Sequence, residues 1–292
     1  SNDAVIYIAD QHHLSTWIAA PLARITGKAV LFWSHGWIKQ ESELRALVRR
    51  AFHKLANRVL VYSDRGRERG IAQGFPAERL VTVYNSLDLA AAERIIGRIE
   101  DGTLSSVRPR VPFEHAERPL VTCIGRLTEQ ARLGLLLDAA QRLESEGRPV
   151  NVLLVGDGPE REGLERLARQ MGLSVRFYGA CYDEEVTGQI LYHSDVVVMP
   201  GKIGLTAIHA LMYGTPAITH GDLDHQMPEA HDDAIRSCFL QLTDKVSVGR
   251  LPVHRDIDGR RVSSRRIGKL VEGMESLADI LFRGLANAHG GI

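Results

Sequence analysis

The sequence predicts an α/β protein built from two domains, each with a parallel β-sheet. Short apolar runs such as AVLFW (29–33), VLVY (59–62) and VVVM (196–199) alternate with segments of helical periodicity. Runs of this kind are typical of strands buried on both faces of a parallel sheet. The chain has 292 residues, and at roughly 150 residues per domain this length favours about two domains.

The composition excludes several classes of protein. With 44% hydrophobic and 25% charged residues, the chain is neither disordered nor fibrous. Its 36 basic and 36 acidic residues give zero formal net charge, which argues against nucleic acid as a partner. The three cysteines are far apart in the sequence, so we expect no disulfide framework and a reducing, cytoplasmic compartment. No apolar run approaches the ~18 residues that a membrane-spanning helix needs.

The first domain is predicted at residues 1–112. Its expected strands share a continuous apolar character and lie at 4–9, 29–33, 58–63 and 80–85, with a helix at 14–25. The segment 101–119 carries three prolines and no clean periodicity, and it is the best linker. A complete Rossmann-like domain has about six strands, so this one is expected to be incomplete and the chain truncated at its N-terminus.

The second domain is predicted at residues 113–245, where strands and helices alternate more regularly. The expected strands lie at 119–125, 151–156, 174–179, 195–200 and 216–219, and the expected helices at 133–143, 160–171, 184–193 and 205–213. Such a doubly wound sheet binds ligands outside the carboxyl ends of its strands. The remaining tail, 246–292, shows convincing helical periodicity only at 269–285, and beyond Glu229 it is either divergent or frameshifted.

Two arginines follow the first strand of the second domain. Arg126 comes just after this strand and Arg132 just before the next helix. Guanidinium groups at a helix N-terminus form a phosphate cradle. Taken alone, the two residues are equally compatible with solvated surface arginines, because most arginines in proteins are exposed.

The stretch PGKIGLTAIHALMYGTP (200–216) is the most informative in the chain. Gly201 and Gly204 would let a ligand approach the backbone closely, and Leu205 and Thr206 begin a helix whose first N–H groups favour an anion. His209 lies one turn further along that helix and roughly faces the same crevice. A glycine turn needed only for packing would explain the same residues.

Together these stretches resemble the nucleotide-binding half of a retaining GT-B glycosyltransferase of the family 4 (group 1) type. The elements that carry the resemblance share their order and spacing with that family over residues 119–229: IGRL (124–127), VGDGPEREGLERLA (155–168), VRFYG (175–179), SDVVVMP (194–200) and GLTAIHALMYGTPAIT (204–219). Three earlier stretches resemble the end of its acceptor domain: SHGW (34–37), VYS (61–63) and VYNSLD (83–88).

The resemblance implies two facing Rossmann-like domains and a nucleotide-sugar donor. The implied donor contacts are Arg126 to the diphosphate, Gly204, Leu205 and Thr206 to the β-phosphate, His209 to the ribose, and the backbone of Gly179 and Cys181 to the base. The implied catalytic residue is His35, near the transferred sugar. The family also implies electrostatic stabilisation of the departing diphosphate, with no metal or other cofactor.

Three positions depart from the family pattern. Most relatives carry two glutamates eight positions apart, which correspond here to Gly201 and His209, so a ribose contact would rest on an imidazole. The usual lysine of the phosphate pair aligns with Ala131. Arg132 or Lys202 would then have to supply the cation.

The sequence Asp222-Leu223-Asp224-His225 matches a metal-binding DxD pattern only in letters. It follows a different strand from the expected diphosphate site, and a polar surface turn is the interpretation we favour.

No acidic residue occurs in 44–58. At about 100° per residue its cations fall largely on one side and its apolar residues on the other: Arg45, Arg49, Arg50, Lys54 and Arg58 against Leu44, Leu47, Val48, Phe52 and Leu55. Two interpretations stay open. One is a core-packed helix with a solvated basic face; the other is a helix that contacts an anionic membrane surface, which would make the protein peripheral on the inner face of the membrane.

The resemblance therefore implies a retaining hexosyltransferase-type enzyme of surface polysaccharide or glycolipid synthesis. It would move a sugar from a nucleotide-diphosphate donor to a saccharide or lipid-linked saccharide acceptor. Two alternatives remain: a GT-B nucleotide-sugar 2-epimerase, and a non-catalytic subunit that binds nucleotide-sugars. The departures at Ala131 and Gly201 favour the second of these alternatives.

Overall fold

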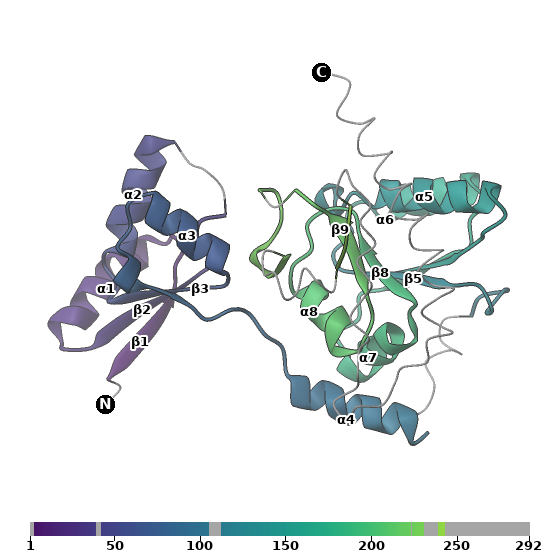
Figure 1. Ribbon diagram of the computed structural model, residues 1–292, viewed down its shortest axis with the longest axis horizontal. Coiled ribbons are helices and arrows are strands. Elements are labelled where there is room, and N and C mark those ends of the chain that lie inside the picture. Colours follow the sequence, from purple (N-terminus) through teal and green to yellow (C-terminus); the bar gives the residue numbers. More distant parts are fainter. Residues whose placement is uncertain (1–2, 39–41, 105–111, 223, 231–238, 243–292) are drawn as a thin grey trace. The chain divides into compact units, whose positions relative to one another are not determined.

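The computed structural model describes residues 3–38, 42–104, 112–222, 224–230 and 239–242, and the chain forms two compact units (Figure 1). The first unit comprises Ser1–Ser86 with Asp222–Asp233, and the second comprises Leu87–Gly221 with Ala234–Ile292.

The first unit is a four-stranded parallel sheet with the strand order β1-β2-β3-β4. Its elements alternate along the chain: β1 (Ala4–Ile8), α1 (Leu14–Ile25), β2 (Ala29–Ser34), α2 (Glu43–His53), β3 (Arg58–Val61), α3 (Asp64–Ala72) and β4 (Leu80–Thr82). Because each strand pairs with its predecessor, right-handed crossovers put the helices on one face of the sheet.

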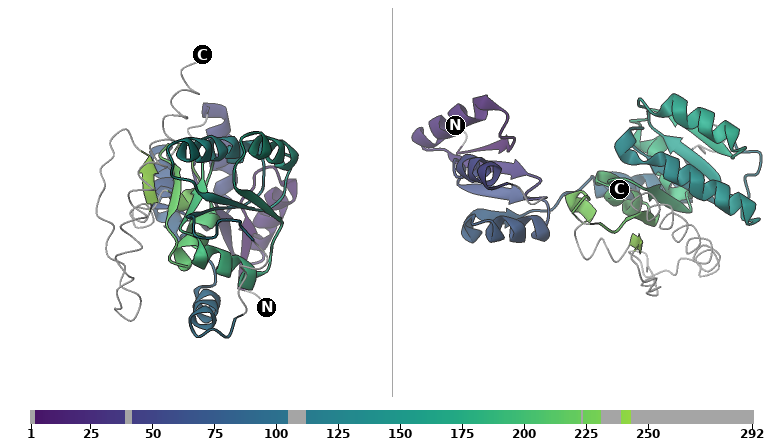
Figure 2. Two further views of the ribbon diagram at one scale, coloured as in Figure 1. Left: turned by 90° about the vertical axis from the view of Figure 1, so that its right-hand side faces the viewer. Right: turned by 90° about the horizontal axis from the view of Figure 1, so that it is seen from above.

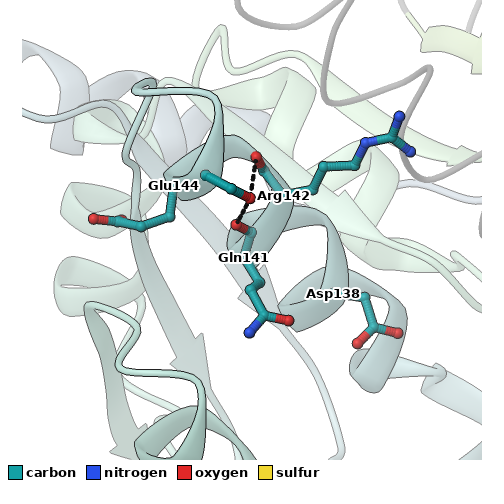
Figure 3. Close-up of a pocket in the computed structure, with 5 residues that line it drawn as sticks. Asp138, Gln141, Arg142 and Glu144 are labelled. Atoms are coloured by element: carbon teal, nitrogen blue, oxygen red, sulfur yellow. Dashed lines mark hydrogen bonds between the residues drawn. The ribbon is translucent and has the colours of Figure 1, made fainter.

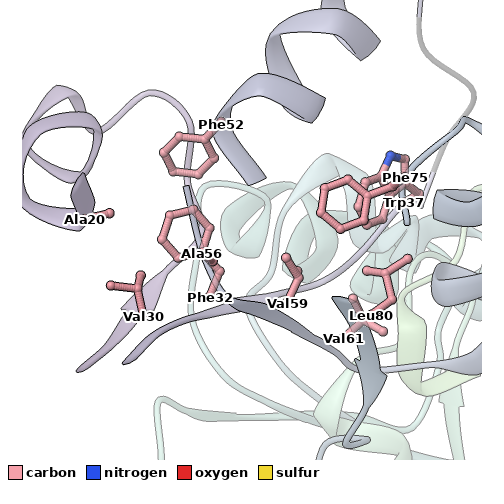
Figure 4. Close-up of a cluster of buried hydrophobic side chains, with 10 residues drawn as sticks. All are labelled: Ala20, Val30, Phe32, Trp37, Phe52, Ala56, Val59, Val61, Phe75 and Leu80. Atoms are coloured by element: carbon pink, nitrogen blue, oxygen red, sulfur yellow. The ribbon is translucent and has the colours of Figure 1, made fainter. Parts of the chain in front are cut away.

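An aromatic core joins these helices to the sheet (Figure 4). Phe32 of β2 packs against Phe52 of α2 with 4.8 Å between ring centroids, and Trp17 of α1 lies 5.0 Å from Phe52. On the opposite face of the sheet the burial is weaker, since Ile6 and Ile8 of β1 are 56% and 76% exposed.

The second unit is a six-stranded parallel sheet with the order β10-β9-β8-β5-β6-β7. Its strands are β5 (Leu120–Ile124), β6 (Asn151–Val155), β7 (Val175–Gly179), β8 (Val196–Met199), β9 (Ala217–His220) and β10 (Phe239–Leu242). Strand β6 is buried at all five positions, as expected for a strand covered on both faces.

Helices cover both faces of this sheet. They are α4 (Leu89–Glu100), α5 (Leu133–Ser145), α6 (Arg161–Gln170), α7 (Glu184–His193) and α8 (Leu205–Met212). Helices α5 and α6 lie on one face, and α7 and α8 on the other (Figure 1, Figure 2). The predicted architecture, two Rossmann-like parallel-sheet domains, is confirmed.

Two features of the second unit were not predicted. Strand β10 pairs with β9 in a segment whose sequence gave no clear signal. Helix α4 packs against α7, where Arg98 pairs with Glu185, so contacts place α4 in the second unit although it precedes the predicted boundary at 112/113. The predicted tail helix at 269–285 and the rest of 246–292 lie outside the described residues.

The core-packed interpretation of residues 44–58 holds only in part. Leu44, Leu47 and Val48, on the apolar side, are 72%, 56% and 41% exposed, whereas Phe52 on the same side is buried. The buried residues of α2 are Phe52 and His53, while Arg49 and Arg50 turn inward to donate hydrogen bonds to the carbonyl oxygens of Gly36 and Gln73, respectively. An arginine can point toward the protein interior when its guanidinium donates hydrogen bonds to backbone carbonyl groups. The positions of the arginines in the sequence therefore do not identify the solvent-exposed face of α2.

Candidate functional site

The strand order of the second unit fixes where a ligand would bind. Strands β5 and β8 are neighbours in the sheet. The chain continues from β5 to β6 on one side of this pair and from β8 to β9 on the other side. Crevices at such a switch point, outside the carboxyl ends of the strands, are the usual ligand sites of doubly wound sheets. Arg126 follows β5, and Lys202 and Gly204 follow the neighbouring β8. The structure therefore gathers three of the predicted site residues at one edge of the sheet.

The glycines of the turn after β6 serve packing. A Cβ atom on Gly156 would lie 1.8 Å from the carbonyl oxygen of Gly125, and one on Gly158 would lie 2.2 Å from that of Leu127. Leu127 N in turn donates to the Asp157 carbonyl oxygen at 3.0 Å. Glycine is required because the turns after β5 and β6 touch backbone to backbone.

Two departures from the family pattern, at positions 131 and 201, lie in direct contact. The Gly201 N–H donates to the carbonyl oxygen of Ala131 at 3.1 Å. A Cβ atom on Gly201 would lie 2.0 Å from the carbonyl oxygen of Gln130, so no side chain fits there. The 3₁₀ turn Glu129–Ala131 thus occupies the space into which a residue-201 side chain would extend.

The three candidate cations differ in their setting. The side chains of Arg126 and Lys202 are exposed. Arg132 is half-buried and precedes α5 with a φ of 52°, in the left-handed region that non-glycine residues seldom adopt. Arg126 and Lys202 are therefore accessible to an anion at the strand ends, and Arg132 stands at the start of α5.

Helix α8 begins beside the end of β5. Gly204 precedes its first residue, Leu205, and Thr206 Oγ1 donates to the carbonyl oxygen of Ile124 at 3.1 Å. This bond anchors the helix start to the strand that precedes Arg126. The first backbone N–H groups of a helix have no intrahelical acceptor and carry a partial positive charge, so they suit a phosphate.

His209 does not stand alone on α8. Its Nε2 lies 2.9 Å from Glu184 Oε1, and the Tyr213 hydroxyl donates to the same oxygen at 2.8 Å. Burial and the Glu184 carboxylate raise the pKa of Tyr213 above its usual range. Sequence reasoning missed Glu184 and Tyr213. An acidic residue in the first turn of a helix, as Glu184 is in α7, is expected for helix stability alone. The spacing of Tyr213 is that of a residue packed in the core, so neither residue gave a signal of function in the sequence.

A cavity of about 350 Å³ adjoins this group. It is lined by Leu87, Asp88, Ala91, Glu184, Leu205, Thr206, His209 and Met212. Three of the predicted donor-binding residues, Leu205, Thr206 and His209, therefore face one cavity of the second unit.

Gly179 and Cys181 mark the end of β7. Gly179 has a φ of 92° and its carbonyl oxygen accepts the Gly156 N–H at 2.8 Å. Cys181 packs against a buried cluster that includes Val155 and Ile190, so its side chain serves packing. The contact of this backbone with a base stays a prediction.

A hollow beside α5 is a poor candidate site (Figure 3). It measures about 450 Å³ and is lined by Asp138, Gln141, Arg142, Glu144 and Ser145. All of these residues belong to one helix, and Ser145 Oγ bonds back to the carbonyl oxygens of Gln141 and Arg142. No strand end contributes to it.

His35 lies in the first unit, at the carboxyl end of β2, and is exposed. Its ring packs edge-on against Tyr62, which follows β3, with 4.9 Å between centroids. Burial raises the pKa of Tyr62, and the Glu229 carboxylate raises it further. Glu229 itself is buried and accepts a hydrogen bond from Asn85 at 2.8 Å.

The DxD-like segment forms a turn that pairs with arginines. Asp224 accepts hydrogen bonds from Arg65 and Arg69 of α3, and these hold the pKa of its carboxyl below the usual range. Asp222 accepts from the Asp224 N–H and lies 2.6 Å from His225 Nδ1. Among the described residues, no three His, Cys, Asp or Glu side chains form a group that could hold a metal ion.

Comparison with known families finds a match over most of the second unit. Residues 118–246 match the family model described as "Glycosyl transferases group 1". Over this part, which is less than half of its length, the chain is similar to that family.

Curated proteins match this chain only in part. 2-Deoxystreptamine glucosyltransferase of Streptomyces kanamyceticus is 27% identical over 160 residues, which cover 49% of this chain and 41% of that protein. Glycogen synthase 2 of Nitrosococcus oceani is 31% identical over 157 residues, covering 50% and 28%, respectively. The match thus spans less than half the length of these relatives.

Solved glycosyltransferase structures share the GT-B fold. Anabaena HepE in complex with UDP aligns over 98% of this chain and 73% of its own, with a TM-score of 0.61 and 18% identity. The catalytic domain of starch synthase IV from Arabidopsis thaliana, bound to ADP and acarbose, aligns over 96% and 68%, with a TM-score of 0.57 and 17% identity.

The described part of the chain contains no helix with the length and apolar character that crossing a bilayer requires.

Proposed function

We propose that this chain transfers a sugar from a nucleotide-diphosphate donor to a saccharide or lipid-linked saccharide acceptor. One observation carries the proposal: within the unit that matches the family, Arg126 at the end of β5 stands at the same sheet edge as the glycine-initiated helix α8. Both features offer positive charge to a diphosphate. Solved relatives bind UDP and ADP, which supports a nucleotide donor for this chain as well.

Isothermal titration calorimetry with UDP-, GDP- and ADP-sugars tests the donor proposal, followed by hydrolysis and transfer assays. Binding with release of the nucleoside diphosphate supports a transferase. Binding without hydrolysis or transfer would instead favour a non-catalytic subunit, and interconversion of the donor sugar would favour a 2-epimerase. The comparisons favour neither of these alternatives. A protein that binds no nucleotide-sugar refutes all three.

We propose that transfer proceeds with retention at the anomeric carbon and without a metal ion. The cationic helix start and Arg126 would stabilise the leaving diphosphate, the role that a divalent cation fills in other enzymes. Proton NMR of the first-formed product reports the anomeric configuration. Inversion refutes the mechanism, and so does a loss of transfer in EDTA that Mg²⁺ restores.

We propose His35 as the catalytic residue near the transferred sugar. Its exposure at the carboxyl end of β2 and its contact with Tyr62 support this role, because a packed ring keeps an accessible imidazole in place. We expect His35→Ala to lower kcat while the Kd of the nucleoside diphosphate stays unchanged. An unchanged kcat removes His35 from the mechanism.

We propose a peripheral location on the inner, anionic face of the membrane, with α2 as the contact. Its exposed residues Leu44, Leu47 and Val48 suit insertion among lipids, and the neighbouring Arg45 and Lys54 are exposed cations. Co-sedimentation with vesicles that contain anionic lipid tests the proposal, with Leu47→Ser as the weakened variant. An absence of binding at low salt refutes it.

A further inference from the structure

One carboxylate oxygen links helices α7 and α8. Oε1 of Glu184, in the first turn of α7, accepts hydrogen bonds from His209 Nε2 at 2.9 Å and from the Tyr213 hydroxyl at 2.8 Å. His209 and Tyr213 are one turn apart on α8, and α7 packs against α8 (Figure 1). The bonds therefore hold the imidazole in one orientation.

The same bonds fix which nitrogen of His209 carries the proton. A carboxylate only accepts hydrogen bonds, so Nε2 must be the donor. In the neutral ring Nδ1 is then left as an acceptor. A hydroxyl group of a ligand would be its natural partner.

The surrounding chain is adapted to keep Tyr213 in this network. A Cβ atom on Gly188, inside α7, would lie 2.4 Å from the Tyr213 hydroxyl oxygen. Glycine inside a helix lowers its stability, so its presence here needs a packing reason. The missing side chain leaves the room in which Tyr213 reaches Glu184.

The cavity beside this network suits an uncharged part of a ligand. It contains the carboxylates of Asp88 and Glu184, and none of the described residues that line it is lysine or arginine. Negative side chains disfavour a diphosphate at close range. Hydroxyl groups of a sugar, however, donate well to carboxylate and imidazole acceptors.

We propose that Glu184 is a positioning residue for the ribose of the nucleotide donor: it holds His209 so that Nδ1 accepts a hydrogen bond from a ribose hydroxyl. The proposal rests on the donor function proposed above. An imidazole accepts a hydrogen bond only at its unprotonated nitrogen. Glu184, by holding the proton on Nε2, leaves Nδ1 as that acceptor.

The test measures discrimination between ribose and deoxyribose. Calorimetry gives the Kd of UDP, GDP and ADP and of their 2′-deoxy and 3′-deoxy analogues. For the wild-type protein we expect one deoxy series to bind about 2- to 10-fold more weakly, as for one lost hydrogen bond. In Glu184→Ala this ratio should fall to about 1, and Glu184→Gln, which keeps an acceptor oxygen, should restore it in part.

Glu185→Ala is the matched control. Glu185 is the next residue on α7, but it pairs with Arg98 of α4, so its loss should leave the ratio unchanged. A Glu184→Ala protein that keeps the wild-type ratio refutes the proposal, and so does a wild-type protein that binds nucleotides without discriminating. A wild-type protein that binds no nucleoside diphosphate refutes the donor function itself, which is a different result.

The tautomer of His209 is an independent readout in the wild-type protein. ¹⁵N NMR should show the neutral ring protonated at Nε2, with Nδ1 unprotonated. A proton on Nδ1 refutes the proposal even if Glu184→Ala does not fold. Loss of the Nε2 preference in Glu184→Ala and its partial retention in Glu184→Gln, with an unchanged thermal unfolding midpoint, separate positioning from a merely structural role.

Discussion

Replacement of the buried His53 should remove much of the acid sensitivity of the first unit. His53 lies within the aromatic core, where its Nδ1 donates to the carbonyl oxygen of Arg49 at 2.8 Å and its ring centroid is 5.0 Å from that of Trp37. Burial lowers its pKa from 6.5 to about 4; the hydrogen bond to the Arg49 carbonyl opposes this shift, and the charge of the Arg49 side chain adds to it. The folded protein therefore resists protonation of this ring.

The size of the effect follows from the shift. A pKa lowered from 6.5 to about 4, at about 1.36 kcal/mol for each pH unit, corresponds to about 3 kcal/mol in the free energy of unfolding. The unfolded chain binds the proton more readily, so the contribution is complete above pH 6.5 and is lost as the pH falls from 6.5 to about 4. At pH 5 the loss should be about 2 kcal/mol.

Urea unfolding followed by tryptophan fluorescence measures this quantity selectively. All three tryptophans, Trp17, Trp33 and Trp37, belong to the first unit. Between pH 7 and pH 5, the free energy of unfolding should fall about 2 kcal/mol less in His53→Gln than in the wild type. The exposed His12→Gln is the control and should behave as the wild type. If His53→Gln keeps the wild-type pH dependence, or if NMR shows that His53 titrates near pH 6.5, the reasoning fails.

Three further substitutions test the second unit. Arg126→Ala should weaken nucleoside diphosphate binding by about 1.5–3 kcal/mol, as for a hydrogen bond to a charged group, while the exposed Arg166→Ala on α6 leaves the Kd unchanged; equal affinities remove Arg126 from the site. Gly188→Ala should lower the free energy of unfolding by about 1–3 kcal/mol, because the added methyl group meets Tyr213. The control Gly97→Ala has open space at its Cβ and should raise the free energy of unfolding by up to about 1 kcal/mol. Changes of the same sign for both variants, measured by circular dichroism in urea, contradict the packing argument. Gly201→Ala should destabilise the second unit by about 1–3 kcal/mol, because its Cβ would meet the backbone of Gln130; a stability equal to that of the wild type in the same assay refutes it.

The sequence predicts the sheets well because their strands are covered by helices. Continuous apolar runs identify β2 and β8, and the helices α1 (Leu14–Ile25) and α7 (Glu184–His193) have the predicted bounds. In each case local composition and tertiary burial agree. Strand β8 is buried at all four positions, and β2 buries Val30 and Phe32 in the core of the first unit. The location of the candidate site also follows, because strand order in a doubly wound sheet places it.

What the sequence does not predict depends on individual side-chain contacts. The arginines of α2 have the spacing of a solvated face, but Arg49 and Arg50 reach backbone carbonyls. Similarly, Glu184 lies in the first turn of α7, where an acidic residue is expected for helix stability alone, but it bonds to His209 of α8. Periodicity reports which face is apolar on average, and it does not report a partner that lies 25 residues away in the chain.

Ala131 and Gly201, two positions at which we expect this chain to depart from the family pattern, constrain one another. Because Gly201 N–H bonds to the carbonyl oxygen of Ala131, and because a Cβ at 201 would meet Gln130, no side chain fits at position 201 while the turn that carries Ala131 lies against it. A glutamate introduced at 201 alone would therefore displace the turn. In the donor site that we propose, positive charge would come from Arg126, the start of α8 and an exposed cation such as Lys202, and hydroxyl recognition from His209 with Glu184. Because these groups would supply the cations and the acceptor, residues 131 and 201 do not by themselves argue for a protein without activity.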